Sequence, residues 1–238
     1  MAEIIPAILT KTYDDLKNKI ALVRGVVPIV QIDICDGVYT QNYTWPFRST
    51  GADRDILELD FHAQDILGER EGLPFWEDIE FELDLMVIDA VENFDFYMKF
   101  GPKRVVFHLE AQRDLESFRD FLEGMDMYIR ETIQIGVAIK PSTPIENIFP
   151  IVPHVDFVQC MGIEKVGFQG QDFDERVLNN VEDLRKEFSE VVISVDGGVN
   201  SDTAQELIDA GADRLVMGSA IFNTSDIIGT VEMFKSLV

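Results

Sequence analysis

Cysteine, histidine and basic residues are scarce in this sequence. The two cysteines, Cys35 and Cys160, are too few for a disulfide framework, and both lie in apolar runs, so we expect buried, reduced thiols. Only 20 Lys and Arg stand against 44 Asp and Glu, which gives a formal net charge of −24. Because a protein that binds the nucleic-acid backbone needs a basic face, this balance argues against nucleic acid as a partner.

Long apolar runs are also missing. No stretch reaches the roughly 18 consecutive apolar residues of a membrane-spanning helix, so no membrane partner is expected. The N-terminal segment becomes acidic and polar too early for a secretory signal, and its apolar start is typical of a strand. Hydrophobic residues still make up 46% of the chain, enough to fill the interior of a globular domain. These features predict a cytoplasmic, globular protein.

What the sequence does contain is a regular alternation of strand and helix patterns. Apolar runs rich in β-branched residues predict strands at 4–9, 29–35, 81–87, 104–109, 133–139, 157–163, 191–195 and 214–217. Between them, helical periodicity is found at 13–23, 91–100, 114–128, 175–188 and 202–210. Strands that alternate with helices form parallel sheets, and eight repeats in this length favour closure over an open, flavodoxin-like sheet. We therefore predict an α/β fold, a (β/α)₈ TIM barrel that forms a single domain over residues 1–238.

One connection is longer than the others. Residues 42–73 separate the second and third predicted strands and exceed a minimal loop and helix. This insertion is a lid, an oligomer contact or an ordinary elaboration, and the sequence does not decide among them.

Glycines follow the last two predicted strands. Gly197 and Gly198 come directly after the seventh strand, and Gly218 with Ser219 after the eighth. Active sites of TIM barrels lie at the C-terminal ends of the strands, and the loops after strands seven and eight frequently hold a phosphate. Backbone amides there could attract an anion locally despite the negative charge of the whole chain. The alternative is that these glycines only form tight turns.

Ordered motifs along nearly the whole chain resemble those of the ribulose-phosphate 3-epimerases. Residues 6–10 resemble that family's PSILS motif, 31–37 its HVDVMDG, 83–87 its VHLMV, 108–111 its HxEA, and 136–143 its GVAINPxT. Residues 161–173 resemble its MxVEPGFGGQxF loop with one residue inserted, and 195–199 and 218–222 resemble its last two strands.

The resemblance implies an isomerase that inverts the stereocentre next to the carbonyl of a ketose phosphate. Such a reaction needs one group to remove a proton and a second to return one on the opposite face. By resemblance these catalytic groups are Asp33 and Asp196, and the substrate is a pentulose or hexulose phosphate such as ribulose 5-phosphate. Relatives are commonly homo-oligomers, so self-association is expected. By resemblance and position, the residues expected to bind substrate and phosphate are Thr10, Met86, Gly167, Gly170, Gly197, Gly198, Gly218 and Ser219.

The implied metal site departs from the family pattern. The family uses two histidines and two aspartates, whereas this chain has Gln31 and Asp84 at the histidine positions. A divalent cation held by Gln31, Asp33, Asp84 and Asp196 would have only oxygen ligands, which favours Mg²⁺ or Mn²⁺ over Zn²⁺. Alternatively the barrel works without a metal, or it has lost epimerase activity and only binds a sugar phosphate.

Lys140 offers a further alternative, because it stands where the family has asparagine. A desolvated lysine there could form a Schiff base, which would make the protein a sugar-phosphate lyase. A solvated lysine, or one paired with Glu110 or Glu164, is the other interpretation. His108 and Glu110 have strand-like spacing, and a supporting role is favoured over catalysis for both.

Overall fold

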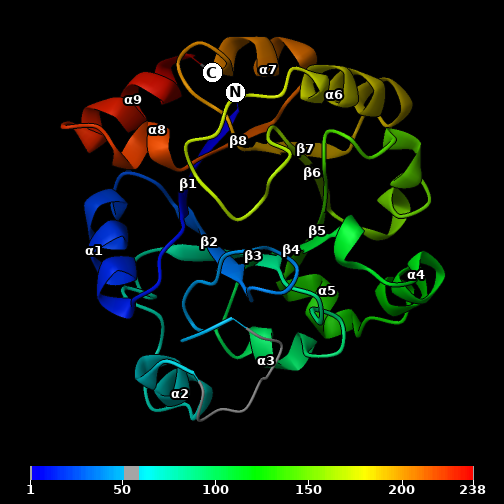
Figure 1. Cartoon of the computed structure of the whole chain (residues 1–238). Helices are drawn as coiled ribbons and strands as arrows, with labels where there is room; N and C mark the ends of the chain where they lie inside the picture. The colour runs from blue at the N-terminus through cyan, green and yellow to red at the C-terminus, as the bar shows by residue number, and fades with distance from the viewer. Residues whose placement is uncertain (1, 51–58, 238) are drawn as a thin grey trace.

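The computed structural model describes residues 2–50 and 59–237, and its centre is a closed ring of parallel strands (Figure 1). Each strand pairs with its neighbours in chain order, and β8 returns to β1 to close the ring. This confirms the predicted TIM barrel. The strands are β1 (Glu3–Ile8), β2 (Ile29–Cys35), β3 (Glu80–Met86), β4 (Arg104–His108), β5 (Gln134–Ile139), β6 (Phe157–Met161), β7 (Val192–Asp196) and β8 (Arg214–Met217).

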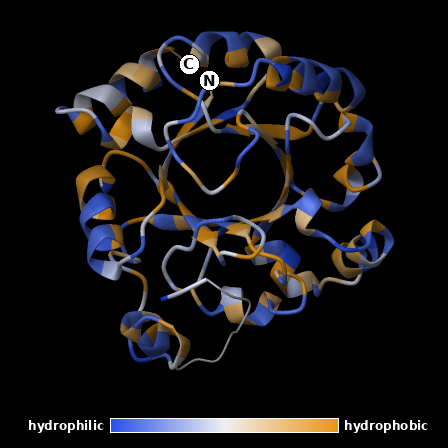
Figure 2. Cartoon of the chain, in the orientation of Figure 1, coloured by the Kyte–Doolittle hydropathy of each residue, from blue (hydrophilic) through white to orange (hydrophobic). Residues whose placement is uncertain are grey.

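Helices surround the barrel and turn their apolar sides toward the strands (Figure 2). The main hydrophobic core lies in this layer between strands and helices. Within the described residues, no helix is long and apolar enough to cross a membrane. The helices are α1 (Tyr13–Val23), α2 (Phe61–Leu67), α3 (Phe94–Met98), α4 (Leu115–Glu123), α5 (Met127–Thr132), α6 (Arg176–Glu187), α7 (Ala204–Ala210), α8 (Ser219–Phe222) and α9 (Ile227–Leu237).

Several predicted helix limits were wrong. The single helix expected over 114–128 is two helices, because Gly124 ends α4 and the Asp126 carboxylate caps α5 by accepting from the Tyr128 N–H. The helix expected over 91–100 is shortened to α3, with turns on either side. For α4 and α5, local capping overrides the hydrophobic period.

The segment 42–73 contains the helix of the second βα unit. Trp45 is buried and donates from Nε1 to Asp60 Oδ1 at 3.1 Å, and Asp60 also caps α2. Residues 51–58 of the expected insertion lie outside the described residues. The three roles considered for this insertion, a lid, an oligomer contact and an ordinary elaboration, stay predictions.

The inside of the barrel is unusually polar for this fold. At the N-terminal ends of the strands, Arg104 Nη1 lies 3.0 Å from Glu3 Oε2 and 3.7 Å from the buried Glu82 Oε2. Arg214 Nε lies 3.3 Å from the same Glu3 oxygen. The interiors of TIM barrels are dominated by branched apolar residues, so charged groups here need partners. This ionic cluster closes the end of the barrel that is remote from the glycine-rich loops.

Candidate active site

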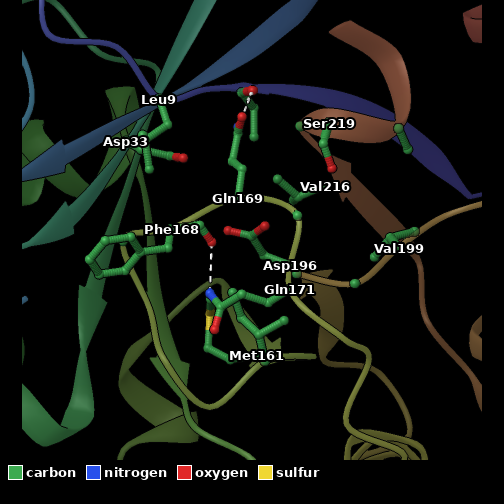
Figure 3. Close-up of a pocket in the computed structure, with 18 of the residues that line it drawn as sticks. Leu9, Asp33, Met161, Phe168, Gln169, Gln171, Asp196, Val199, Val216 and Ser219 are labelled. Atoms are coloured by element: carbon green, nitrogen blue, oxygen red, sulfur yellow. Dashed lines mark hydrogen bonds between the residues drawn. The ribbon is translucent and has the colours of Figure 1, made fainter. Parts of the chain in front are cut away.

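A cavity of about 260 Å³ opens at the C-terminal ends of the strands. Asp33 on β2 and Asp196 at the end of β7 both line it, although they are far apart in the chain (Figure 3). The structure therefore brings together the two carboxylates that were predicted to be catalytic. The other predicted site residues that line this cavity are Met86, Gly167, Gly170, Gly197, Gly198, Gly218 and Ser219.

The loop between β6 and α6, residues 162–175, lies across the open end of the barrel (Figure 1). The amide Nε2 of Gln169 donates to the Ala7 carbonyl at 3.2 Å (Figure 3), and Asn42 Nδ2 donates to the Gly167 carbonyl at 2.9 Å. A side chain at Gly218 would collide with the Gln169 amide. The loop thus contacts β1, the loop after β2 and the residues after β8, and it covers the cavity.

Two consecutive glycines after β7 form one wall of the cavity. Gly197 and Gly198 have φ values of 99° and 69°, a left-handed conformation that favours glycine. The Gly198 carbonyl accepts from Asn200 Nδ2 and Thr203 Oγ1, both at 3.0 Å. Because the next N–H of a trans peptide points opposite to the carbonyl, the Val199 N–H is directed away from these side chains. Val199 itself lines the cavity.

Asp33 and Asp196, which line the cavity, form a cluster of three carboxylates with the fully buried Asp84, and we call these three residues the acid cluster. One oxygen atom of each lies within 4.8 Å of the others. Asp33 and Asp84 are neighbours in register between β2 and β3, which explains why they face each other. Gln31 lies two residues before Asp33 on the same face, and its Nε2 donates to Asp33 Oδ1 at 2.8 Å and to Asp196 Oδ2 at 2.9 Å.

Two further side chains contact the acid cluster from β4 and β6. His108 Nε2 lies 2.8 Å from Asp84 Oδ1, and both side chains are fully buried. Gln159 Nε2 donates to Asp84 Oδ2 at 3.2 Å and to Asp196 Oδ2 at 3.5 Å. His108 therefore has the supporting position that its spacing favoured. The sequence analysis missed Gln159, whose only signal is a lone amide inside the apolar β6 sequence.

Burial and the repulsion of neighbouring charges raise the pKa of Asp33 and of Asp196. Burial raises the pKa of Asp33 to about 7, the charge of Asp84 adds to this, and the hydrogen bond from Gln31 opposes it. Burial also raises the pKa of Asp196 well above its usual range, with further contributions from the charges of Asp33 and Asp84. Like charges at close range cannot all persist in a buried site, so this cluster favours bound protons or a bound cation.

The oxygen atoms around the acid cluster fit a hard divalent cation. Within the part of the chain that the structure describes, Gln31 Oε1 and Gln159 Oε1 are buried without a hydrogen-bond partner. An unsatisfied buried acceptor costs about 1–3 kcal/mol. Carboxylate and amide oxygens are the ligands that Mg²⁺ and Mn²⁺ prefer, whereas Zn²⁺ prefers nitrogen and sulfur.

Thr10 and Lys140 lie outside the lining of the cavity. The Thr10 hydroxyl donates to Asp15 Oδ2 at 2.7 Å. The Lys140 Nζ lies 4.9 Å from the centre of the Tyr39 ring, while its backbone N–H donates to Glu110 Oε1 at 2.8 Å. Glu110 therefore contacts the backbone of Lys140, while the lysine side chain lies against Tyr39, and this differs from the side-chain pairing that was expected.

Comparison with known proteins gives the chain a family. Residues 70–222 match the ribulose-phosphate 3-epimerase family. The chain belongs to this family. The ribulose-phosphate 3-epimerase of Candida glabrata is 31% identical over 236 residues, which cover 99% of this chain and 92% of the relative. That of Mycobacterium tuberculosis is 29% identical over 234 residues, which cover 94% of this chain and 87% of the relative.

Solved structures show the same barrel at lower identity. KGPDC from Streptococcus mutans superposes with a TM-score of 0.69 at 13% identity and covers 99% of this chain and 96% of its own. A 3-hexulose-6-phosphate synthase superposes with a TM-score of 0.64 at 16% identity and covers 100% of this chain and 99% of its own. At these identities the likeness shows the fold alone.

Proposed function

We propose that this protein is an isomerase that epimerises a ketose phosphate, such as ribulose 5-phosphate, at the carbon next to the carbonyl. Membership of the family supports the reaction class. The observation that carries the proposal is that Asp33 and Asp196 line one cavity together with Gly197, Gly198 and Ser219. Two acid/base groups and a wall of backbone amides are what an epimerase for a phosphorylated sugar requires.

The pKa of each of the two carboxylates is raised, and because they lie close together one can be protonated while the other is ionised, which suits opposite roles. A base with a pKa near 7 can accept a proton at neutral pH, and this describes Asp33. In the cluster without a cation, the pKa of Asp196 is raised well above its usual range, which favours a protonated form that can donate. Asp33 takes the proton from the substrate carbon, and Asp196 returns one to the opposite face of the enediolate. In the reverse reaction the two residues exchange roles.

The remaining walls bind the substrate and exclude water. Backbone N–H groups after β7 and β8 hold the phosphate, and their glycines allow close approach of the backbone. Met86 and Met161 give the cavity an apolar side next to the acids. The β6–α6 loop covers the bound sugar and keeps solvent protons away from the enediolate.

A divalent cation belongs to this proposal, held by Asp33, Asp84, Asp196 and the Gln31 amide oxygen. Gln31 and Asp84 replace the histidines implied by the family pattern, so nitrogen ligands give way to oxygen. When bound, such a cation supplies Lewis-acid stabilisation of negative charge on the enediolate. The oxygen donors favour Mg²⁺ or Mn²⁺ over Zn²⁺.

A second candidate is a barrel that binds a sugar phosphate without turning it over. The Nε2 of Gln31 donates to one oxygen of each catalytic carboxylate, and these hydrogen bonds, which engage both acids, favour that candidate. Mixing the protein with ribulose 5-phosphate and Mg²⁺, Mn²⁺ or Zn²⁺ in ²H₂O separates the two. An epimerase inverts the substrate and incorporates deuterium next to the carbonyl, and Asp33→Asn and Asp196→Asn each abolish inversion. Asp183→Asn, at an exposed acid on α6 outside the cluster and the covering loop, is the control. Binding without exchange under any of the three metals would overturn the isomerase proposal.

A further inference from the structure

Gln159 contacts two of the three carboxylates of the acid cluster and, within the part of the chain that is described, the oxygen of its amide has no partner. Its side chain is fully buried, and its Nε2 donates to Asp84 Oδ2 at 3.2 Å and to Asp196 Oδ2 at 3.5 Å. The same nitrogen lies 3.7 Å from Met161 Sδ. Its Oε1 is buried and has no hydrogen-bond partner among the described residues.

Gln31 on β2 repeats this pattern. Its Nε2 donates to Asp33 and Asp196, and its Oε1 is likewise buried without a partner in the described chain. The two amides therefore both turn nitrogen toward the carboxylates and leave oxygen unsatisfied. Buried polar atoms normally have partners, so two such oxygens beside one acid cluster call for a specific explanation.

A half-turn of an amide exchanges these two atoms. The terminal torsion of glutamine is broad and two-fold, so Oε1 can take the place of Nε2 with little movement of the rest of the side chain. With nitrogen inward, the amides donate hydrogen bonds to the carboxylates in place of a cation. With oxygen inward, they add two ligands to three carboxylates, and the whole donor set becomes oxygen.

We propose that Gln159 is a further cation-binding residue of the acid cluster, and that Gln159 and Gln31 turn their amide oxygens inward when Mg²⁺ or Mn²⁺ binds. This inference rests on the cation in the proposed function. It assigns to β6 a ligand that the chain supplies in addition to Gln31 and the three acids. Two reversible amides also allow the cluster to stay hydrogen-bonded when the cation leaves.

Binding of Mn²⁺ to the chelator-treated protein tests this without measuring activity. Gln159→Met keeps the volume of the side chain and removes the amide, and we expect it to weaken Mn²⁺ binding by roughly tenfold or more, since loss of a residue that supports a metal typically costs 10–100-fold. Gln159→Glu supplies an oxygen ligand and should restore or strengthen binding. A residue that only packs would give the reverse order, with methionine tolerated and glutamate harmful.

Matched controls show whether the effect is specific. Gln134 accepts from Arg214 at the other end of the barrel, so the matched change Gln134→Met should leave Mn²⁺ binding unchanged. Thermal unfolding in chelator shows whether each variant is folded. In the wild-type protein, Mg²⁺ should shift the side-chain amide NMR signals of Gln31 and Gln159. The signal of Gln134, which accepts from Arg214 at the other end of the barrel, should not move.

The possible results of these experiments test the cation-binding role of Gln159 separately from the proposed isomerase activity. Equal Mn²⁺ affinity in the wild type and Gln159→Met, with both folded, overturns the role of Gln159. A wild-type protein that epimerises in chelator and binds no Mn²⁺ overturns the inference and leaves the isomerase standing. Mn²⁺ binding that weakens in Gln159→Met, without any substrate exchange, supports the inference and overturns the isomerase.

Discussion

Asp84 helps to hold the pKa of Asp33 high, and Asp84→Asn should therefore lower it. Burial is the largest cause of the raised pKa of about 7, and the charge of Asp84 is the next. Oxygen atoms of the two side chains lie within 4.8 Å of each other. At that distance two unit charges interact by about 3–4 kcal/mol at an effective dielectric constant of about 20. The 2.8 Å contact with His108 offsets part of the Asp84 charge, so we expect the pKa of Asp33 to fall by roughly one to two pH units.

The assay is a pH titration of the aspartate carboxyl ¹³C signals in chelator-treated protein. The Asp33 signal, assigned through its loss in Asp33→Asn, should titrate near pH 7 in the wild type and at lower pH in Asp84→Asn. Asp172→Asn should leave it in place, because Asp172 is exposed and outside the acid cluster. An Asp33 signal that titrates in the ordinary range of about 4 in the wild type, or that does not move in Asp84→Asn, would refute this account of the cluster.

Substitutions at three other positions test the loop, the buried acid and the lysine. Gln169→Leu removes the donor to the Ala7 carbonyl. Because one hydrogen bond contributes about 1 kcal/mol, its loss should raise KM about fivefold with little change in kcat. An unchanged KM would contradict a covering role for this contact. Burial raises the pKa of Glu82 from 4.5 to about 7, so the folded chain binds a proton that the unfolded chain has lost, and stability falls as pH rises between these values. Glu82→Gln should reduce this pH-dependent loss of stability, measured as the free energy of unfolding in urea at several pH values. An equal slope of that free energy against pH in the variant would contradict the raised pKa of Glu82. Borohydride should trap no adduct with ribulose 5-phosphate at Lys140, which lies outside the cavity lining, and a reducible adduct there would revive the lyase.

The barrel was predictable because each strand is a short apolar run, and eight such runs alternate with helices in a chain of this length. The meeting of Asp33 and Asp196 was predictable because both end up at the C-terminal ends of parallel strands. The limits of the helices were harder to predict from the sequence, because local caps such as Gly124 and Asp126 divide one periodic segment into two helices.

The contacts of individual polar side chains could not be read from the sequence. Gln159 is one amide in an apolar strand, and only the closure of the ring shows that it faces Asp84 and Asp196. Thr10 lies two residues after the end of β1, and its hydroxyl donates to Asp15 in the first turn of α1. Such pairings depend on strand register and on competing partners, which sequence periodicity does not specify.

Asp33 and Asp196 are proposed to act on opposite faces of one substrate carbon. Deuterium exchange at that carbon, measured in variants that do not invert the substrate, tests this most directly. Each epimer of the substrate is incubated in ²H₂O with Asp33→Asn and with Asp196→Asn. The account predicts a complementary pattern: neither variant inverts the substrate, and each still exchanges the proton of only one epimer, the one whose base remains. Inversion by either variant, or identical exchange of both epimers by both variants, would contradict it.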